Sequence, residues 1–359
     1  MRPLIAYLSE SALLHNLAQI KRFVGDRKIC AVVKANAYGH SIERIAPILG
    51  NKVDYFAVAS IEEALVIRKL LITTPIILLE GVFSSLEYDI CASNNFVPSI
   101  QNARQLEWLE SANLIKHIDV FLKIDTGMHR LGFAPQNFME CMQKLESISH
   151  IDNIHLISHL ACADDRDHPL NNQQTTCFSS LKHPRIASYS LLNSAGIMTL
   201  ATHKPERVEL VRAGLMLYGV SPLPNQKLES IDLQAVMTLT SEIIAINQVD
   251  KDQAIGYSAT YVTQKQTKVA VVACGYADGY PREICNAYVL LNGIKAPVIG
   301  RVAMDMLTID VSHIEQVQIG DKVELFGSNL PVEQVANWAN TIPYTILTHI
   351  APRVRFDKI

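Results

Sequence analysis

The sequence predicts an α/β protein in two parts, an N-terminal TIM (β/α)8 barrel and a C-terminal, mostly-β domain. From the N-terminus to about residue 218, short apolar runs alternate with segments whose apolar residues recur at helical spacing. After the proline-bearing segment 221–226, strand patterns dominate. With 359 residues, the chain is long enough for both parts. We therefore expect the barrel over residues 1–221 and the β domain over residues 222–359.

The barrel prediction depends on eight strand candidates, each a short apolar run. In chain order they are residues 29–33, 55–59, 76–79, 96–99, 118–124, 154–159, 187–191 and 208–211. Segments such as 61–70 lie between them and carry apolar residues at helical spacing. In a barrel of this kind the active site lies at the carboxyl ends of the strands and in the loops that follow them.

The predicted β domain contains strand-like runs at residues 233–246, 268–274, 287–291 and 322–326. Asn292-Gly293 follows the third run directly, and this dipeptide is a strong β-hairpin signal. Residues 331–339 predict a short helix with proline near its start.

Composition limits the classes of function. The formal net charge of -3 gives no broad electrostatic footprint for nucleic acid or an anionic membrane. No apolar stretch approaches the length of a membrane span, and the N-terminus lacks the apolar core of a signal peptide. The seven cysteines are scattered without a Cys-x-x-Cys pair, which indicates reduced core residues rather than a disulfide or zinc framework. We therefore expect a cytoplasmic protein that acts on a small molecule.

Chemically useful side chains lie at or after the ends of the predicted barrel strands. In chain order they are Lys34, Lys123, Asp125, Arg130, His159, Asn193, Ser194 and Arg212. Because the carboxyl ends of barrel strands meet at one face, we expect these residues to share one site.

Lys34 is the most informative of these residues. It follows a buried strand pattern, and an amine that is partly desolvated there becomes a nucleophile toward an aldehyde, able to form a Schiff base. The alternative is a lysine that simply reaches solvent at a strand end. Residues 29–40, Ile-Cys-Ala-Val-Val-Lys-Ala-Asn-Ala-Tyr-Gly-His, resemble the pyridoxal-phosphate lysine motif of alanine racemases. Further segments similar to this family are residues 121–132, 193–196, 211–219, 255–261, 275–279 and 300–306.

This resemblance covers nearly the whole chain and implies a specific enzyme. The family interconverts L-alanine and D-alanine with pyridoxal 5′-phosphate, and D-alanine is destined for peptidoglycan. Its members have a barrel domain, a C-terminal β domain and a head-to-tail homodimer, in which the β domain contributes to the partner subunit's active site. By this resemblance Lys34 acts as the base facing the α-proton of D-alanine, and Tyr257 faces that of L-alanine.

The resemblance also assigns residues to the cofactor. These are Lys34, Tyr38, His159, Asn193, Ser194, Arg212, Gly214, Leu215 and Tyr344. Arg212 would face the pyridine nitrogen, where a guanidinium can only donate a hydrogen bond. The ring would then be a weaker electron sink than one paired with a carboxylate, which favours racemisation over transamination.

For the substrate, the resemblance implies that Arg130 and the backbone of Met304 bind the carboxylate. Tyr276 would narrow the entry, and Asp305 would support the same loop as Met304. Lys123 near Arg130 places like charges together, and carbamylation of Lys123, which occurs in some members of the family, would reverse its charge.

Two alternatives stay open at this point. One is a racemase of broader or different specificity, for example for serine, and the other is a pyridoxal-phosphate carrier or homeostasis protein without turnover. The carrier proteins resemble the barrel alone, whereas this chain has the second domain. The sequence departs from the family pattern at Ser41, at Ala303 and at Gly-Tyr-Ser over residues 256–258, but no functional side chain is lost.

Overall fold

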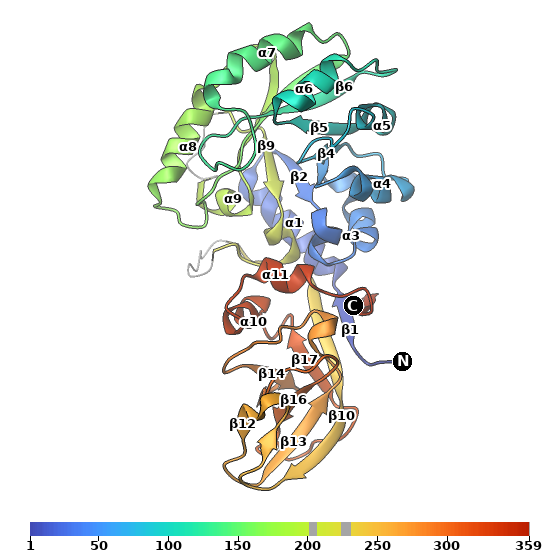
Figure 1. Cartoon of the computed structure of the whole chain (residues 1–359), viewed down its shortest axis with the longest axis vertical. Helices are drawn as coiled ribbons and strands as arrows, with labels where there is room; N and C mark the ends of the chain where they lie inside the picture. Colours follow the sequence, from blue (N-terminus) through green and yellow to red (C-terminus); the bar gives the residue numbers. More distant parts are fainter. Residues whose placement is uncertain (201–206, 224–230, 359) are drawn as a thin grey trace. The chain divides into compact units, whose positions relative to one another are not determined.

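The computed structural model describes residues 1–200, 207–223 and 231–358, which form two compact units (Figure 1). The barrel unit consists of the described residues within the ranges 16–217 and 221–232. The β unit consists of the described residues within the ranges 1–15, 218–220 and 233–359. The sequence placed residues 1–221 in one domain, whereas the structure groups the first 15 residues with the β unit. The physical reason is strand β1 (Ile5–Leu8), which pairs with strands of that unit.

Eight parallel strands form the nearly closed sheet of the barrel unit, in the order β8-β7-β6-β5-β4-β3-β2-β9. They are β2 (Lys28–Val32), β3 (Tyr55–Val58), β4 (Ile76–Leu78), β5 (Phe96–Ile100), β6 (Ile118–Lys123), β7 (Ile151–Ile157), β8 (Ile186–Ser190) and β9 (Leu210–Ala213). The two end strands also approach each other, since the amide of Glu209 donates to the carbonyl of Tyr189 over 3.1 Å. The predicted (β/α)8 barrel is confirmed.

Helices surround these strands (Figure 1). They are α1 (Glu10–Val24), α3 (Ile42–Leu49), α4 (Ile61–Lys69), α5 (Glu87–Asn94), α6 (Ala103–Glu110), α7 (Phe138–Ser147), α8 (Pro169–Ser180) and α9 (Ser194–Leu200). Helix α3 illustrates why they pack on the sheet: Ile42, Ile45 and Leu49 are buried and recur at helical spacing, so they form one apolar face.

The segment α2 (Lys34–Tyr38) is a left-handed turn. Ala35, Asn36, Ala37 and Tyr38 have φ values of 52°, 54°, 55° and 52°. Residues with a Cβ rarely adopt this conformation, and each costs roughly 1–2 kcal/mol there. The turn begins where β2 has just ended, so this strained backbone lies directly beside Lys34.

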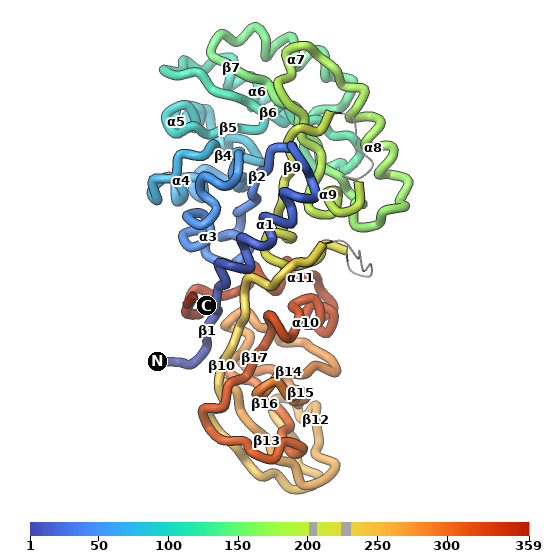
Figure 2. The backbone as a smooth tube through the Cα atoms, turned by 180° about the vertical axis from the view of Figure 1, so that it is seen from behind, coloured from blue at the N-terminus to red at the C-terminus, as the bar shows by residue number. Residues whose placement is uncertain are grey.

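Strand β10 (Met237–Val249) is the central element of the β unit. It pairs with β1, β13 (Thr267–Val272) and β17 (Lys322–Phe326), all antiparallel. Strand β1 also pairs in parallel with β18 (Arg355–Lys358), and Figure 2 shows β1 beside β10 from behind. Strand β16 (Leu307–Asp310) extends the sheet from β13. The sequence did not predict β1, β16 or β18.

The remaining elements of the β unit include the predicted hairpin, which is confirmed. Strands β14 (Tyr288–Leu291) and β15 (Ile294–Pro297) are joined by Asn292 and Gly293, with φ values of 49° and 84°. Positive φ at both central residues is characteristic of a type I′ turn, whose twist matches that of the two strands it joins. Strands β11 (Ala254–Ile255) and β12 (Tyr261–Val262) form a small second sheet. Helices α10 (Val332–Trp338) and α11 (Pro343–Thr348) follow β17.

Two further sequence-based expectations can be compared with the fold. Every helix within the described parts of the chain is too short or too polar to cross a lipid bilayer. All seven cysteines are free thiols. Cys30, Cys91, Cys141 and Cys274 are buried, as expected for core residues, whereas Cys162 and Cys177 are half-buried and Cys285 is exposed.

Candidate active site

Basic side chains converge at the carboxyl ends of the barrel strands. Lys34 follows β2, and Lys123 is the last residue of β6. The sequence predicted Arg212 just after its strand, whereas the structure places it within β9. Burial, followed by the charges of Arg212, Arg130 and Lys34 in that order, lowers the pKa of the Lys123 amine to about 8. The four cations are therefore close enough to act on one another, as the shared-face prediction requires.

Lys34 has the environment of a reactive amine. Burial lowers its pKa below the ordinary value of a lysine, and the charge of Arg130 adds to the effect, while Glu80 and Glu63 oppose it. A lysine with a lowered pKa is neutral in a larger fraction of molecules and is therefore more nucleophilic.

Arg212 is buried and held in a fixed position. Its Nη1 donates to Ser190 Oγ over 2.7 Å, and its Nη2 donates to the carbonyl of Ser158 over 2.7 Å. Nη2 also lies 3.0 Å from His159 Nδ1. Burial, together with the charge of Arg212, holds the pKa of His159 well below its ordinary value. The imidazole is therefore neutral, and its Nδ1 accepts from the guanidinium.

A small polar cradle lies beside these cations, formed by Tyr38, Ser194 and Gly214. The amide of Gly214 donates to Ser194 Oγ over 2.9 Å. A Cβ at Gly214 would lie 2.7 Å from the hydroxyl oxygen of Tyr38, so only glycine leaves this space open. The amide of Gly196 donates to Asn193 Oδ1 over 2.8 Å, which fixes the start of α9 behind Ser194. The hydroxyls of Tyr38 and Ser194, beside the space that Gly214 leaves, suit an oxyanion.

The loop after β6 carries Arg130. The carboxylate of Asp125 accepts from the amides of Gly127, Met128 and His129 over 2.9, 2.9 and 3.0 Å. Burial alone would raise the pKa of Asp125, but these hydrogen bonds lower it. Asp125 therefore stays ionised and fixes the turn, while Arg130 is exposed in the single chain. A small pocket at this face is lined by Lys123, Arg130, Ser158 and His159.

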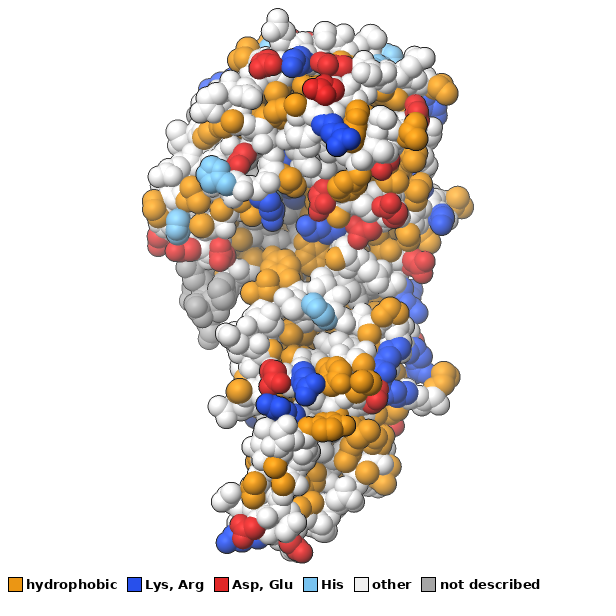
Figure 3. Space-filling model, in the orientation of Figure 1, with side chains coloured by type: hydrophobic (Ala, Val, Ile, Leu, Met, Phe, Trp, Pro, Cys, Tyr) orange, Lys and Arg blue, Asp and Glu red, His pale blue; other side chains and the backbone are white. Residues whose placement is uncertain are grey.

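The other predicted site residues belong to the β unit. Tyr257 is 66% exposed and Met304 is 52% exposed, while Tyr276, Asp305 and Tyr344 are half-buried. Hydrophobic side chains come to the surface of this unit in several groups (Figure 3). Large exposed apolar side chains in water are unfavourable, so Tyr257 and Met304 are suited to contact another molecule.

Sequence reasoning missed the residues that hold the site together. Glu63 accepts from the amide of Ala35 over 2.6 Å and from the amide of Ala59 over 2.9 Å, so one carboxylate braces the left-handed turn beside Lys34. Ser158 and Ser190 hold Arg212. Glutamate and serine are common residue types, and only their long-range contacts reveal these roles.

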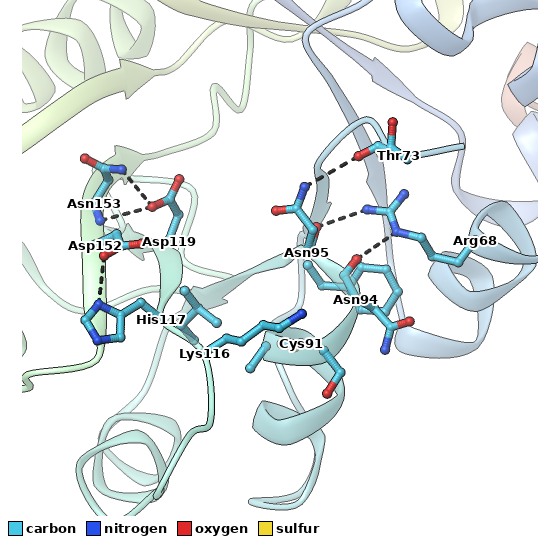
Figure 4. A pocket seen from close by; sticks show the side chains of 14 residues that line it. Arg68, Thr73, Cys91, Asn94, Asn95, Lys116, His117, Asp119, Asp152 and Asn153 are labelled. Carbon is cyan, nitrogen blue, oxygen red and sulfur yellow. Dashed lines mark hydrogen bonds and ion pairs between the residues drawn. The ribbon is translucent and has the colours of Figure 1, made fainter. Parts of the chain in front are cut away.

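A second, open groove lies at the other end of the strands (Figure 4), where Phe96 and Ile118 begin β5 and β6. Its polar groups bond one another. Arg68 donates to the carbonyl of Asn94 over 2.7 Å, and His117 pairs with Asp152 at 2.9 Å. Conserved chemistry in this fold class lies at the carboxyl ends, so we place the site at the Lys34 face.

The combination at the Lys34 face suits one kind of ligand. A primary amine with a lowered pKa can bond a carbonyl carbon, three further cations favour an anion, and the cradle suits a phosphate or similar oxyanion. Together they fit an anionic aldehyde.

Comparison with known proteins gives two family matches that together cover most of the chain. The model of the alanine racemase N-terminal domain matches residues 8–222, and that of the alanine racemase C-terminal domain matches residues 236–357. An alanine racemase of Legionella pneumophila (strain Lens) is 43% identical over 357 residues, covering 99% of each chain. A biosynthetic alanine racemase of Pseudomonas aeruginosa is 40% identical over 356 residues, covering 99% of this chain and 98% of that one.

Solved structures agree with these matches. The crystal structure of biosynthetic alanine racemase from Pseudomonas aeruginosa superposes with a TM-score of 0.95 at 39% identity, covering 100% of both chains. Alanine racemase from Bartonella henselae with covalently bound pyridoxal phosphate gives a TM-score of 0.90 at 30% identity, again over 100% of both chains.

Proposed function

The chain belongs to the alanine racemase family, and we propose that it interconverts L-alanine and D-alanine, supplying D-alanine for peptidoglycan. The observation that carries this proposal is the convergence of the Lys34 amine, the cations Lys123, Arg130 and Arg212, and the cradle at Gly214 on one face of the barrel. A racemase must remove the α-proton from one face of the amino acid and return a proton to the other.

Pyridoxal 5′-phosphate is the cofactor, and the residues present fit it. When bound, this group withdraws electrons from the α-carbon of the amino acid and so makes the α-proton acidic. Lys34 would hold the aldehyde carbon through its amine. Tyr38, Ser194 and the amides of Gly214 and Leu215 would bind the phosphate, and Gly214 leaves the space that its oxygens would need. The family resemblance assigns Tyr344 to the phosphate as well.

Arg212 faces the pyridine nitrogen in this proposal. Burial lowers the pKa of its guanidinium to about 10, so the side chain stays protonated near neutral pH and can only donate. Ser158, Ser190 and His159 hold Arg212 in place. His159 would also stack on the cofactor ring, as the family resemblance implies. Asn193 keeps the Ser194 turn in shape. A guanidinium at this position would only donate to the ring nitrogen, and would so limit the electron withdrawal that the cofactor supplies.

Two bases on opposite faces of the substrate exchange the proton. Lys34 would serve the face that carries the α-proton of D-alanine, and Tyr257 would serve the face that carries that of L-alanine. Racemisation needs both, because one base on one face returns the proton where it was taken. Tyr257 comes from the β unit of a second copy in a head-to-tail homodimer, and its 66% exposure in the single chain supports this arrangement.

The substrate carboxylate is bound by Arg130 and by the backbone of Met304. The guanidinium of Arg130 gives a charge-assisted hydrogen bond, and Asp125 fixes the loop that carries it. Tyr276 narrows the entry, and Asp305 supports the loop of Met304. Together these groups orient the α-carbon between Lys34 and Tyr257.

The test is chiral analysis of holoenzyme incubated with L-alanine in deuterated water. We expect D-alanine that carries α-deuterium. Lys34→Ala should abolish it, whereas Lys28→Ala, at the exposed other end of the same strand, should not. Formation of D-serine from L-serine at a similar rate would replace the alanine assignment by a broader racemase. Bound cofactor with neither exchange nor racemisation would support a carrier protein instead.

A further inference from the structure

Asp278 is the centre of a cluster of hydrogen bonds that lies outside the cofactor residues described so far. Its side chain is 0% exposed, and it accepts from Arg2 Nη2 over 2.7 Å, from Arg353 Nε over 2.7 Å and from the amide of Gly275 over 2.8 Å. Arg2 Nη1 also donates to Asp278 Oδ1, the oxygen that accepts from Arg353 Nε. A buried carboxylate is retained at such a place only when it is paired and hydrogen-bonded. We call Arg2, Asp278 and Arg353 the clamp.

The clamp joins three segments that are far apart in the sequence. Arg2 precedes β1, Asp278 ends the turn 275–278, and Arg353 lies just before β18. The same two arginines also bind the loop that contains Met304 and Asp305. Arg2 Nη2 donates to the carbonyl of Asp305, and Arg353 Nη2 donates to Asp305 Oδ1 over 2.8 Å. All of these residues belong to the β unit.

The two loops bound by the clamp are in direct backbone contact. The amide of Tyr276 donates to the carbonyl of Ala303, and the amide of Ala277 donates to that of Met304, each over 3.0 Å. A Cβ at Gly275 would lie 2.3 Å from the carbonyl oxygen of Met304, so the loops touch as closely as glycine allows. Moving either loop must therefore move the other.

We propose that Arg2, Asp278 and Arg353 position the Met304 loop and the Tyr276 turn for substrate binding, so that the start of the chain helps to set the affinity for alanine. This inference rests on the proposed function, because it takes Met304 and Tyr276 as the residues that meet the substrate. The clamp itself touches neither cofactor nor substrate, so its members are positioning residues.

The charges in the clamp explain why it holds over the working range of pH. Burial alone would raise the pKa of Asp278, but the hydrogen bonds from Arg2, Gly275 and Arg353 lower it below the ordinary value of an aspartate. The hydrogen bonds that Arg353 donates to Asp305 and Asp278 raise the pKa of its guanidinium. Both partners therefore stay charged at neutral pH, and the clamp behaves as a fixed brace.

Arg2→Ala in the full-length holoenzyme is the most informative variant. Arg2 is an exposed residue, with 34% of its side chain accessible to solvent, so its loss should leave the fold intact. Losing its charge-assisted hydrogen bonds should raise KM for L-alanine by about tenfold while kcat stays within about twofold. Arg2→Lys keeps the charge but not the paired donors, and should recover part of the loss.

Hydrogen exchange gives a second readout that does not need catalysis. In Arg2→Ala the amides of Tyr276 and Ala277 should exchange faster than in the parent protein, while those of strand β13 should not change. The matched control is Glu324→Gln. It removes the charge of a carboxylate that accepts from the amides of Asn329 and Leu330, and so weakens these hydrogen bonds in another loop of the same unit. The control should leave KM and the exchange of Tyr276 unchanged.

The outcomes separate the clamp from the proposed function. Unchanged exchange at Tyr276 and Ala277 would overturn the clamp, and so would faster exchange with unchanged KM, because the brace would then be structural alone. An equal rise of KM in Glu324→Gln would likewise overturn it. If the parent holoenzyme does not racemise alanine, the proposed function fails, and the exchange arm still decides whether the clamp holds the two loops.

Discussion

Replacing Lys123 tests how the site manages its excess of positive charge. Burial, then Arg212, Arg130 and Lys34, lowers the pKa of Lys123 from 10.5 to about 8. At 1.36 kcal/mol for each pKa unit, holding the ammonium form in this site costs about 3 kcal/mol relative to water. At pH 7 about one Lys123 in ten is then neutral, compared with about one in 3,000 for an ordinary lysine.

The neutral amine explains why we predict carbamylation at this position. Its lone pair attacks the carbon of dissolved carbon dioxide, an N–C bond forms, and one proton leaves to the solvent. The side chain thereby changes from a cation to an anion beside Arg130 and Arg212, and repulsion becomes attraction. Because the reactive fraction grows as pH rises through about 8, carbamylation at a fixed concentration of dissolved carbon dioxide should be greater at pH 9 than at pH 7.

The assay is ¹³C NMR of holoenzyme equilibrated with ¹³C-labelled bicarbonate. We expect a carbamate signal that Lys123→Met removes and that Lys144→Met leaves in place. Lys144 is a suitable control because its hydrogen bond to Glu140 raises its pKa, so its amine stays protonated. A crystal structure of active enzyme with a free Lys123 amine, grown at pH 8 with bicarbonate present, would refute the reasoning.

Three further substitutions test other parts of the site. Tyr257→Phe should slow conversion of L-alanine to D-alanine by at least about 100-fold in initial-rate chiral chromatography, and a parental rate would remove Tyr257 as a base. Arg212→Glu should increase the ratio of transamination, measured as pyruvate release, to racemisation. Arg212→Lys is the control that keeps the cation. An equal ratio in the two variants would contradict the role of Arg212 at the ring. Gly275→Ala should lower the melting temperature by about 5 °C or more in calorimetry, because its Cβ would lie 2.3 Å from the carbonyl oxygen of Met304. An unchanged melting temperature would show that the loop can shift to admit it.

The barrel was predictable because its evidence is local. A buried parallel strand is a short run of apolar residues, and the predicted run 29–33 corresponds to β2 (Lys28–Val32) within one residue. Strand β1 (Ile5–Leu8) carries the same kind of local signal, but it pairs with β10 and β18, more than 200 residues away. Periodicity in a sequence does not record which strand is the partner, so the pairing of β1 with strands of the β unit could not be predicted.

The site was predictable where the fold brings strand ends together, and unpredictable where single contacts decide. Lys34, Lys123 and Arg212 follow from the rule that carboxyl ends of barrel strands share a face. Arg2 and Asp278 do not, because an arginine near the N-terminus resembles a solvated surface residue until its partner is known. Their pairing is a consequence of tertiary packing alone.

The left-handed turn after Lys34 shows why such contacts matter for function. Four consecutive residues at positive φ cost several kcal/mol at roughly 1–2 kcal/mol each, and two alanines among them contribute no side-chain hydrogen bond in return. The turn is held from outside, by Glu63 on the amide of Ala35 and by Asn36 Oδ1, which accepts from the amide of Ile42 over 2.9 Å. A relaxed right-handed turn would point the chain after β2 in another direction. These hydrogen bonds therefore hold the strained backbone that carries the Lys34 amine and the Tyr38 hydroxyl, and the placement of these two groups gives a reason for keeping a costly conformation at this point of the chain.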